Sequence, residues 1–595
     1  MSAFVFGSGG CHYALRHAAE QRCACVCGGW TGASRAAGTA RTTSRALSHT
    51  LFVRCASAAS SSTPASSSSD ATQTQTKKQQ GGKPNTGGPA ASAQQQGISS
   101  RANDYSQWYL DVLAAGELVD TSPVKGCMVI RPHGFAIWEF MRDWLDARLK
   151  ARGVQNAYFP IFIPQSFLSK EAEHVEGFAK ECAVVTHHRL RVAADPGANN
   201  GQVLEVDPDA KLEEPLVVRP TSETIIWNMF QRWISSYREL PLLINQWANV
   251  VRWEMRTRPF LRTTEFLWQE GHTAHASAEE ALSYARDMID VYAELCENML
   301  AMPVVKGIKS PSERFAGAEE TFTIEGQMQN GWALQCGTSH FLGQNFARAF
   351  DVYFMNQEEK RELVWATSWG VSTRLMGALI MTHSDDTGLV LPPSVAPVQV
   401  ILIPIFKNAE TKAQVGAYVS SLRERLLRHG VRVKVDDREN VRPGAKYFEW
   451  ERKGVCLRME VGPRDMEKNQ TYCASRTRKD KFSIPVDEQF ERSVLEKLSS
   501  IQRDMLETAK ARVAARTFRV DSYDEMKQML SAGADNAGFY IVPWKCDADN
   551  ERQIKEECKA TIRCYPMDMQ HEVQGKVCFY SNEPATHMAI FARAY

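Results

Sequence analysis

The pattern of hydrophobic and polar positions is clearest between Pro241 and Ser277. Two β-prone runs, Leu242–Glu254 and Phe260–Gln269, flank a polar connection at Met255–Pro259. Runs rich in β-branched and aromatic residues are typical of strands, and a polar connection that ends in proline is typical of a turn. The pattern therefore predicts an antiparallel hairpin with a basic loop.

One face of this predicted hairpin carries reactive side chains instead of core residues. Because side chains alternate between the faces of a strand, Arg252 and Glu254 share one face of the first run. The residues that share a face of the second run are Arg262, Thr264, Phe266 and Trp268. Planar guanidinium groups suit carboxylates or phosphates, and aromatic rings suit a base or a small apolar ligand. The face is therefore predicted to bind a nucleotide beside a small acid; the alternative is a solvated face held by Arg–Glu pairs.

A helical pattern precedes the hairpin, from Gly134 to Gly153. Its apolar residues recur at spacings of three and four: Ile137, Phe140, Met141, Trp144, Leu145 and Leu149. On periodicity alone such a stripe is more often intramolecular core than an interface with a second chain. Farther on, Leu216–Arg219 is predicted to be a short strand. Thr221–Glu223 would begin a helix, with its two hydroxyl groups as candidate caps.

Beyond Leu391-Pro392-Pro393 the pattern changes to alternating strands and helices. The predicted elements are the strand Val398–Phe406, the helix Ala409–His429, the strand Val431–Asp436, the helix Pro443–Lys453 and the strand Cys456–Gly462. This βαβαβ order predicts an α/β domain. A long helical pattern then runs from about Phe482 to Ala515 and leads into a small α/β tail. We therefore predict a multidomain α+β and α/β protein, with domains at 103–393, 394–500 and 501–595.

The first residues differ from the rest in composition. Residues 1–69 contain one acidic residue, Glu20, against six arginines and no lysine. This composition is typical of an organellar transit peptide, which we predict at 1–70; it would direct the protein to mitochondria, plastids or both, and without it the cytoplasm is expected. Residues 71–102, rich in Ser, Gln, Gly and Pro, are predicted to be a disordered linker, so that the folded protein begins near Asn103.

The overall composition excludes some classes of protein. The 595-residue chain has a net charge of +1, with 44% hydrophobic and 23% charged residues. These values are ordinary for a globular protein, and an RNA partner would need a local basic surface. No apolar run approaches the ~20 residues that span a bilayer, so no membrane segment is predicted. The 15 cysteines are spread over the chain, and outside the leader we expect reduced thiols.

Short motifs around the hairpin resemble those of a known family. Arg252-x-Glu254, followed by Arg262-x-x-x-Phe266, resembles motif 2 of the class II aminoacyl-tRNA synthetases. The other two class II motifs have counterparts at Gly153–Phe162 and Gly370–Ile380. Three further runs narrow the resemblance to the prolyl-tRNA synthetases: Thr221–Glu223, Gly271–His275 and Leu334–His340. The resemblance extends from about Tyr105 to Tyr595.

The resemblance implies a class II catalytic domain with an antiparallel sheet, an α/β anticodon-binding domain and a small α/β C-terminal domain. It also implies a homodimer, with the 134–153 helix and the run after it at the interface. The implied activity is ATP-dependent ligation of L-proline to tRNA(Pro) through prolyl-adenylate, with Mg²⁺. The alternative is an inactive paralogue that only binds RNA. The charged residues expected in the site are all present, which favours the enzyme: Glu223, Arg252, Arg262 and Arg374.

The interval between Arg262 and Arg374 bears on editing. It measures 374 − 262 = 112 residues, which leaves no room for an inserted editing domain beside the remaining catalytic elements. In this respect the chain resembles the archaeal and eukaryotic type, and most closely the organellar form of plants. Whether another protein clears mischarged alanine is left open.

The resemblance also assigns residues to the two substrates. The proline site would comprise Thr221, Glu223, Arg252, Trp268, Glu270, His272, Phe315, His340 and Ser368. The ATP site would comprise Arg252, Glu254, Arg262, Thr264, Phe266, Gln335, Thr338 and Arg374. The catalytic candidates are Arg252, which would bridge the proline carboxylate and the α-phosphate, and Arg374, against which Phe266 would stack the adenine. An acid such as Glu223 suits the secondary ammonium of proline, which has two donors and a positive charge.

No metal site is predicted. Cytosolic relatives bind zinc in the C-terminal domain through four cysteines, but this chain keeps only Cys546 and Cys578. Glu551 and Tyr580 occupy the other two positions. Since two thiolates do not complete a structural tetrahedral site, we expect no zinc.

Other candidates keep simpler alternatives. The pairs Cys336 with His340 and His272 with His275 lack the further ligands that a metal needs. For His275, a core histidine bonded to the backbone is the alternative. The candidates for anticodon contact, each of which could equally be a solvated charge, are Arg438, Lys446 and Arg464.

Overall fold

The computed structural model describes residues 97–169, 181–193, 203–478 and 480–595. The predicted leader and most of the predicted linker lie outside this part of the chain. Within the described ranges, no helix is both long and apolar enough to cross a membrane. All the elements below belong to one compact unit, Asn85–Tyr595.

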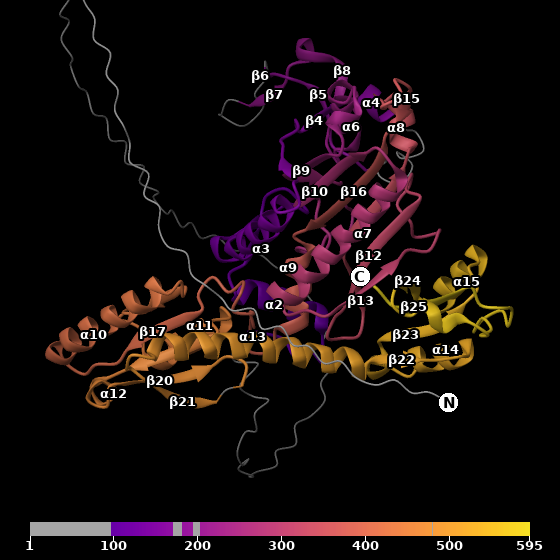
Figure 1. The fold of residues 1–595 in the computed structure, drawn as a ribbon. Coiled ribbons are helices and arrows are strands. Elements are labelled where there is room, and N and C mark those ends of the chain that lie inside the picture. Colours follow the sequence, from indigo (N-terminus) through magenta and orange to yellow (C-terminus); the bar gives the residue numbers. More distant parts are fainter. Residues whose placement is uncertain (1–96, 170–180, 194–202, 479) are drawn as a thin grey trace, which may run out of the picture. The chain divides into compact units, whose positions relative to one another are not determined.

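An eleven-stranded sheet forms the centre of this unit (Figure 1). In sheet order its strands are β22 (Thr517–Arg519), β23 (Phe539–Trp544), β25 (His587–Ala592), β24 (Thr561–Pro566), β11 (Val304–Ile308), β12 (Glu320–Gln327), β13 (Ala333–Gly343), β16 (Trp365–Ser372), β10 (Glu265–His275), β9 (Leu242–Val251) and β3 (Gln155–Asn156). Neighbours are antiparallel except β22–β23 and β3–β9. The predicted antiparallel sheet is confirmed, and the C-terminal tail extends it.

Helices cover the central sheet where its buried side chains are apolar. α7 (Ala278–Glu294) packs along β12, β13 and β16, and α9 (Arg374–His383) follows β16 directly. The buried face of α7 includes Ala281, Ala285, Met288, Ile289 and Tyr292. These residues recur at helical spacing, so burial of one stripe fixes the helix on the sheet.

The predicted hairpin exists, but its connection is longer than predicted. β9 and β10 pair antiparallel, with Phe266 opposite Val250. The strands leave 252–264 as the connection, so it was wrong to place Arg252, Glu254, Arg262 and Thr264 on strand faces. The backbone turns away because Arg258 and Arg262 exchange backbone hydrogen bonds and Phe260 adopts a positive φ of 60°.

The helix predicted at 134–153 is α3 (Pro132–Lys150). Of its apolar stripe, the side chains that join the main core are Ile137, Met141, Leu145 and Leu149. Phe140 and Trp144 are partly buried against the same core, and the guanidinium carbon of Arg432 lies 4.3 Å from the ring centroid of Phe140. In this chain the stripe therefore packs as intramolecular core.

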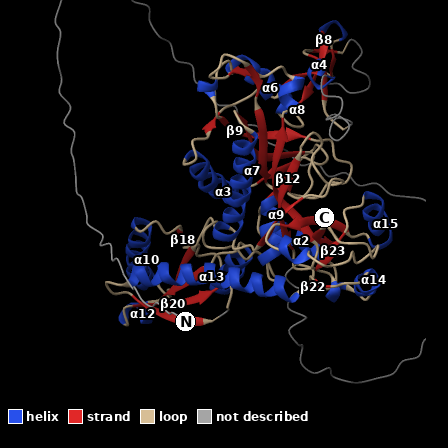
Figure 2. Cartoon of the chain, turned by 45° about the vertical axis from the view of Figure 1, so that its right-hand side comes forward, coloured by secondary structure: helices blue, strands red, loops and turns tan. Residues whose placement is uncertain are grey.

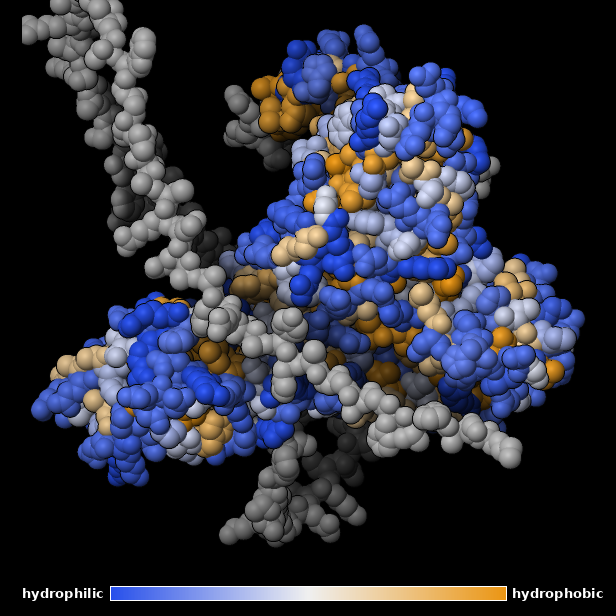
Figure 3. Space-filling model, in the orientation of Figure 1, coloured by the Kyte–Doolittle hydropathy of each residue, from blue (hydrophilic) through white to orange (hydrophobic). Residues whose placement is uncertain are grey.

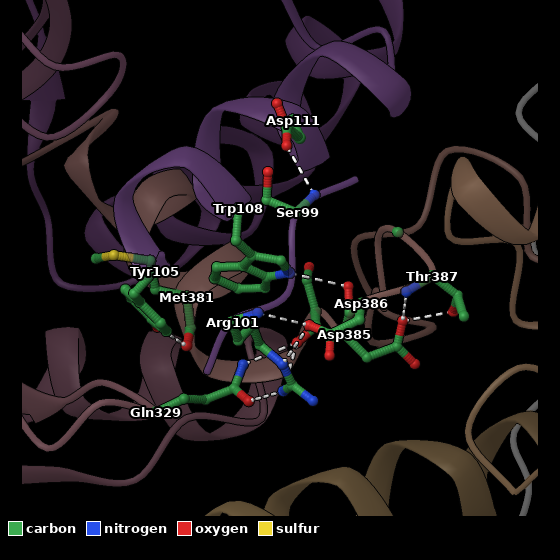
Figure 4. Close-up of polar contacts among 12 residues, drawn as sticks. Ser99, Arg101, Tyr105, Trp108, Asp111, Gln329, Met381, Asp385, Asp386 and Thr387 are labelled. Carbon is green, nitrogen blue, oxygen red and sulfur yellow. Dashed lines mark hydrogen bonds and ion pairs between the residues drawn. The ribbon is translucent and has the colours of Figure 1, made fainter. Parts of the chain in front are cut away.

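Residues 97–104, here called the N-terminal segment, are folded onto the protein (Figure 4). Ile98 is only 2% exposed and belongs to the main core. The Arg101 guanidinium donates Nε to Asp386 at 2.9 Å and Nη1 to the carbonyl of Ser384 at 3.3 Å. Asp104 then caps α2 (Tyr105–Ala115). The prediction of a disordered linker through residue 102 is therefore wrong for 97–102, because one buried isoleucine and one anchored arginine hold the segment.

The predicted βαβαβ domain is confirmed. Its sheet has the order β18 (Val433–Val435), β17 (Val400–Pro404), β19 (Leu457–Val461), β20 (Gln470–Ser475) and β21 (Lys481–Pro485). Its helices are α10 (Ala409–Arg428), α11 (Pro443–Arg452) and α12 (Pro463–Glu467). The long helix α13 (Phe490–Ala515) begins later than predicted, since Phe482 lies in β21, and the boundary predicted at residue 500 falls inside it (Figure 2). The tail adds α14 (Tyr523–Ser531) and α15 (Ala548–Cys558).

Smaller elements complete the described chain. They are β1 (Val119–Thr121), β2 (Met128–Ile130), β4 (Phe162–Pro164), α4 (Gln165–Ser169), β5 (Val184–His187), β6 (Leu190–Val192), β7 (Leu204–Val206), β8 (Lys211–Val218), α6 (Glu223–Trp233), α8 (Asn345–Ala349), β14 (Tyr353–Met355) and β15 (Arg361–Leu363). β8 contains most of the predicted 216–219 strand. The hairpin of β6 and β7 exposes its apolar residues, with Leu204 61% exposed, and Figure 3 shows an apolar patch there.

Candidate active site

Most of the predicted site residues line one cavity of about 450 Å³. Those that do are Thr221, Glu223, Arg252, Phe266, Trp268, Glu270, His272, Phe315, Gln335, Thr338, His340, Ser368 and Arg374. They come from the segment between β8 and α6 and the start of α6, from β10, β13 and β16, from the loop after β11, from the 252–264 connection and from the start of α9. The fold therefore brings together residues that are up to 153 positions apart (374 − 221).

Two partly buried guanidinium groups line the cavity. Arg252 donates Nε to the carbonyl of Pro220 at 3.0 Å, and its guanidinium carbon lies 5.6 Å from the Phe266 ring and 5.4 Å from the Trp268 ring. Burial lowers the pKa of Arg252 to about 10, although the charge of Glu223 opposes this. A guanidinium whose charge is poorly solvated gains most from an anionic ligand.

Arg374 is the second of these groups. It is the first residue of α9 and donates Nε to the carbonyl of Leu261 at 3.1 Å. Burial lowers the pKa of Arg374, and the positive charge of Arg262 lowers it further. The two arginines and the Phe266 ring therefore form a cationic and aromatic surface that suits a nucleotide.

Two carboxylates, Glu223 and Glu270, line the same cavity near Arg252. Glu270 is 3% exposed and accepts hydrogen bonds from Ser222 at 2.6 Å and Gln246 at 2.7 Å, with His272 Nε2 at 3.2 Å. Burial alone would raise the pKa of Glu270, but the bonds from His272, Ser222 and Gln246 together bring it below its usual value. Glu270 is therefore held ionised in a dry site.

The hydroxyl groups of Thr221 and Ser222, at the start of α6, bond to carboxylates of the cavity. Ser222 occupies the N-cap position, yet its hydroxyl makes no capping bond and instead donates to Glu270. Thr221 donates to Glu223. The capping alternative is therefore wrong for Ser222, because a buried carboxylate competes successfully for its hydroxyl.

The rings of Phe315 and His340 line the cavity near His272. His340 lies in a stacked arrangement on Phe315, with ring centroids 4.5 Å apart, and its Nδ1 lies 3.0 Å from the Thr321 hydroxyl. Burial and the nearby His272 lower the pKa of His340 to about 3. His340 is therefore a neutral imidazole at physiological pH, and it adds no cation next to a substrate ammonium.

His275 does not reach this cavity. It is fully buried, with Nε2 2.8 Å from the Thr273 hydroxyl and Nδ1 3.5 Å from Glu280. The alternative of a core histidine holds, although its partners are side chains where we expected backbone groups.

A β-bulge explains how β13 serves the cavity. The register between β12 and β13 shifts between Ile324 and Glu325, where Gln335 opposes Glu325 and Gly337 opposes Ile324. The extra residue, Cys336, therefore changes the alternation. This shift accounts for the irregular spacing by which Gln335, Thr338 and His340 all line the cavity.

Three predicted ATP residues do not line the cavity. Glu254 and Arg262 lie in the 252–264 connection and form an ion pair with an N–O distance of 3.9 Å. Thr264 donates its backbone N–H to the carbonyl of Gly126. Sequence reasoning missed other lining residues: Glu313, Arg314, Ala316, Thr321, Cys336, Gly337, Trp369, Gly370, Val371 and Ser372. All but Thr321 adjoin predicted residues on the same loop or strand, and Gly370, Val371 and Ser372 also lie in the run that resembles motif 3; Thr321 lies opposite His340 on β12.

Comparison with known proteins decides the family. The chain matches the families described as "tRNA synthetase class II core domain (G, H, P, S and T)" over residues 205–383, "Anticodon binding domain" over 399–496 and "Prolyl-tRNA synthetase, C-terminal" over 523–595. It is 54% identical over 500 residues to the proline–tRNA ligase of Bacteroides fragilis, an alignment that spans 84% of this chain and 99% of that protein. This chain belongs to the prolyl-tRNA synthetases.

Other relatives agree with this family. The proline–tRNA ligase of Phocaeicola vulgatus is 53% identical over 500 residues, with the same coverage of 84% and 99%. The crystal structure of prolyl-tRNA synthetase from Cryptosporidium parvum, complexed with halofuginone and AMPPNP, is 40% identical. It superimposes with a TM-score of 0.77 and covers 84% of this chain and 100% of that one. These relatives establish a class II synthetase core with an anticodon-binding domain.

The C-terminal domain of this prolyl-tRNA synthetase uses its four candidate zinc positions differently. The Cys546 thiol is exposed and accepts a bond from Tyr565 at 3.6 Å, whereas Cys578 is buried in the domain core. Glu551 accepts a hydrogen bond from Ser310 at 3.0 Å. Among the described residues, no group of three or more His, Cys, Asp or Glu side chains could hold a metal ion. The absence of zinc stays a prediction.

The anticodon-binding domain places two of the three predicted basic residues in ion pairs. Arg438 bonds to Asp436 at 2.6 Å and to Glu449 at 2.8 Å. Lys446 is buried and donates to the backbone carbonyl of Asp436 at 2.9 Å. Arg464 is exposed on α12. A cavity of about 170 Å³ lies elsewhere in this domain, and its polar and aromatic lining includes Tyr447, Trp450, Glu451, Arg458, Arg476 and Lys481.

Proposed function

We propose that this prolyl-tRNA synthetase activates L-proline with ATP inside the 450 Å³ cavity and then transfers the prolyl group to tRNA(Pro). The observation that carries the assignment is the polarity of the cavity. Arg374 lies near Arg262, whereas Glu223, Glu270 and His272 lie together, and Arg252 interacts with Arg374 and with both carboxylates. The arginines and Phe266 suit a nucleotide, and the carboxylates suit an ammonium group.

The nucleotide end would bind ATP by stacking and by charge. The adenine would stack on Phe266, with the Arg374 guanidinium on its other face. Gln335 and Thr338, on the bulged part of β13, would donate and accept hydrogen bonds at the sugar and phosphates. AMPPNP, with which the Cryptosporidium parvum enzyme was crystallised, is an ATP analogue that keeps the adenine, the ribose and the α-phosphate.

Magnesium fits this site as part of the substrate. Glu270 already accepts hydrogen bonds from Ser222 and Gln246, so it offers little to a cation at the nucleotide end. Mg²⁺ commonly keeps its waters and binds through substrate phosphates. Bound in this way, the ion would neutralise charge on the phosphates of ATP.

The other end would bind proline. Glu223 would accept a hydrogen bond from the secondary ammonium, and Thr221, which donates to Glu223, would orient that carboxylate. The stacked rings of Phe315 and His340 would contact the pyrrolidine ring. Because His340 is neutral, it would not repel the ammonium.

Arg252 would then promote the reaction. The proline carboxylate attacks the α-phosphate in line, and pyrophosphate leaves; the barrier lies mainly in bringing two anions together. A guanidinium between them would stabilise the charge as they approach, at the point where Arg252 lies between the aromatic rings and Glu223. A protein nucleophile is not required.

ATP–pyrophosphate exchange with each amino acid in turn tests this function. Exchange with proline alone, or with proline far above the others, is expected. An inactive paralogue would give no exchange with any amino acid, and exchange with threonine or glycine but not proline would overturn the assignment.

Dimerisation is also part of the proposal. The run after α3, which resembles motif 1, leaves Tyr158 73% and Phe162 45% exposed. Large exposed aromatic side chains are enriched in protein interfaces. Analytical ultracentrifugation should therefore give a homodimer, and Tyr158→Ser should shift it toward monomer; a monomeric wild-type protein would contradict the proposal.

Organellar import completes the proposal and rests on the composition of residues 1–69, which hold six arginines and one acid. This composition, together with a catalytic domain that has no room for an inserted editing domain, supports a relationship with the organellar form of plants. A fluorescent fusion of residues 1–75 should reach mitochondria or plastids. A diffuse cytosolic signal would contradict it.

A further inference from the structure

The C-terminal domain reaches the catalytic sheet through a buried ion cluster. β24 pairs with β11 at a seam where the backbones lie close: a Cβ added to Gly307 would be 2.4 Å from the Cβ of Cys564. At this seam Arg563 donates Nε and Nη2 to Oε2 of Glu325 at 3.0 and 2.9 Å. Lys309 donates to Oε1 of Glu325 at 2.8 Å and to the Arg563 carbonyl at 2.7 Å. The side chains of all three are nine-tenths or more buried.

The cluster continues to the wall of the active-site cavity. The Thr323 hydroxyl lies 3.0 Å from Oε1 of Glu325 and 3.3 Å from the carbonyl oxygen of Gly337. Gly337 lines the cavity. In the sheet, Glu325 is the residue directly opposite Gln335, at the bulge between β12 and β13. A continuous set of contacts therefore joins the C-terminal domain to the bulged stretch of β13.

A bulge needs such support. It interrupts the ladder of backbone hydrogen bonds, so its geometry depends on neighbouring side chains more than a regular strand does. Burial alone would raise the pKa of Glu325, but Lys309 and Arg563 bring it below its usual value. Glu325 is therefore a fixed anion whose two oxygens are held by different donors.

We propose that Arg563 is a positioning residue for ATP: it fixes Glu325, and through Glu325 and Thr323 it fixes the stretch of β13 that carries Gln335 and Thr338. The proposal rests on the proposed assignment of these two residues to ATP. Arg563 itself does not line the cavity. Its effect should be larger on ATP than on proline, because Gln335 lies directly opposite Glu325 at the bulge, whereas the proline-side His340 lies five residues farther along β13 (340 − 335).

Arg563→Met is the central test. It leaves the neutral Lys309–Glu325 pair and the Lys309 bond to the backbone carbonyl, so the protein should fold. Oε2 of Glu325 loses both donors, and the carboxylate can rotate. We expect the KM for ATP in proline-dependent exchange to rise about tenfold, with the KM for proline within about twofold. Arg563→Lys, which restores one donor, should recover part of the loss.

Arg593→Met is the matched control. Arg593 belongs to the same domain, and its guanidinium donates to the carbonyl groups of Cys558 and Leu530. It should lower the melting temperature without separating the two KM values. If Arg563→Met behaves in the same way, its role is structural and the proposal is overturned.

Thr323→Val tests the path. It should raise the KM for ATP in the same direction, and the double variant with Arg563→Met should be no worse than the stronger single variant, because both break one path. Additive effects would contradict the path. Gln335→Ala tests the assignment of this strand to ATP. If Gln335→Ala raises the KM for ATP while Arg563→Met leaves it normal, the inference about Arg563 is overturned and the ATP assignment stands. A normal KM for ATP in Gln335→Ala overturns the ATP assignment of this strand and the inference with it.

Discussion

The arginines of the active-site cavity differ from those of the anticodon-binding domain in what surrounds them. Arg252 and Arg374 donate Nε to backbone carbonyl groups, and burial lowers the pKa of both. Arg438 bonds to Asp436 and Glu449, and these carboxylates raise its pKa. Burial disfavours the charge of the two cavity arginines, so an anionic ligand would stabilise that charge, whereas two carboxylates already stabilise the charge of Arg438.

The difference teaches that positive charge alone does not mark a binding site. The chain has no acidic residue from 363 to 384, the stretch that carries Arg374. Asp436 and Asp437, in contrast, directly precede Arg438. Local acids therefore distinguish Arg438 from Arg374 but not from Arg252, because Glu254 lies two residues after Arg252 and pairs with Arg262. The following variants test this contrast.

Arg252→Lys should have the largest effect. Lysine keeps the charge but loses the planar fork, so one of the two substrate oxygens is left unpaired in a dry site. We expect a loss of about 3 kcal/mol in the transition state, or about a hundredfold in proline-dependent ATP–pyrophosphate exchange, mainly in rate. The control is Arg256→Lys, an exposed position in the same connection, which should keep the wild-type rate. Wild-type exchange in Arg252→Lys, or failure to fold, would show that Arg252 is structural.

Removing the N-terminal segment should have the next largest effect, because Arg101 is already paired and Ile98 is already buried. A protein that starts at Asn103 should lose about 2 kcal/mol of stability relative to one that starts at Gly97. Thermal unfolding of the two proteins measures this. Identical melting temperatures would mean that the segment contributes nothing to the fold.

Asp385→Asn tests another arginine that is paired with a carboxylate, Arg476, through the pH dependence of stability. Arg476 donates Nη1 and Nη2 to Asp385 at 2.8 and 2.6 Å. Burial alone would raise the pKa of Asp385, but the bonds and charge of Arg476 hold it well below its usual value. A depressed pKa gives stability that is present above about pH 4 and lost as pH falls. The variant should be about 1.5 kcal/mol less stable at pH 7, and this gap should narrow progressively as pH falls below about 4; a constant gap would exclude the ion pair as its cause.

Arg438→Met should have the smallest effect. The side chain is 42% exposed, and Asp436 keeps the bond from Trp450. We expect a loss of about 0.5 kcal/mol in stability and an unchanged KM for tRNA. Arg464→Met, at an exposed residue of α12, should raise the KM for tRNA while exchange without tRNA stays normal. A larger tRNA effect from Arg438 than from Arg464 would reverse the contrast.

Much of the fold could be predicted because its strands and helices carry regular apolar periods. The βαβαβ order and the β9–β10 pair follow from local patterns. The 252–264 connection could not, because Thr264 leaves the strand path for a bond to the distant Gly126. The N-terminal segment could not either, since composition describes an average and Ile98 is a single residue that fills a place in the core.

The sequence motifs predicted part of the site, and the pairing of strands in the structure adds the other residues that line it. Arg252 and Arg374 lie in motifs with several fixed positions, which makes their recognition specific. Cys336 and Gly337 line the cavity only because the bulge shifts the register of β13, and a bulge has no reliable sequence signal. Arg563 is 189 positions after Arg374 (563 − 374). Only the pairing of β24 with β11 brings it near the same sheet.

The continuity of the central sheet has a consequence for synthesis on the ribosome. β25 pairs with both β23 and β24, yet it follows them in the sequence. Until β25 emerges, β24 lacks this partner, and the edge of β11 at Gly307 and Ile308 stays open. An open edge is a template for pairing with other chains. The nascent protein is therefore most exposed to aggregation late in translation, after most of its catalytic residues have already been made.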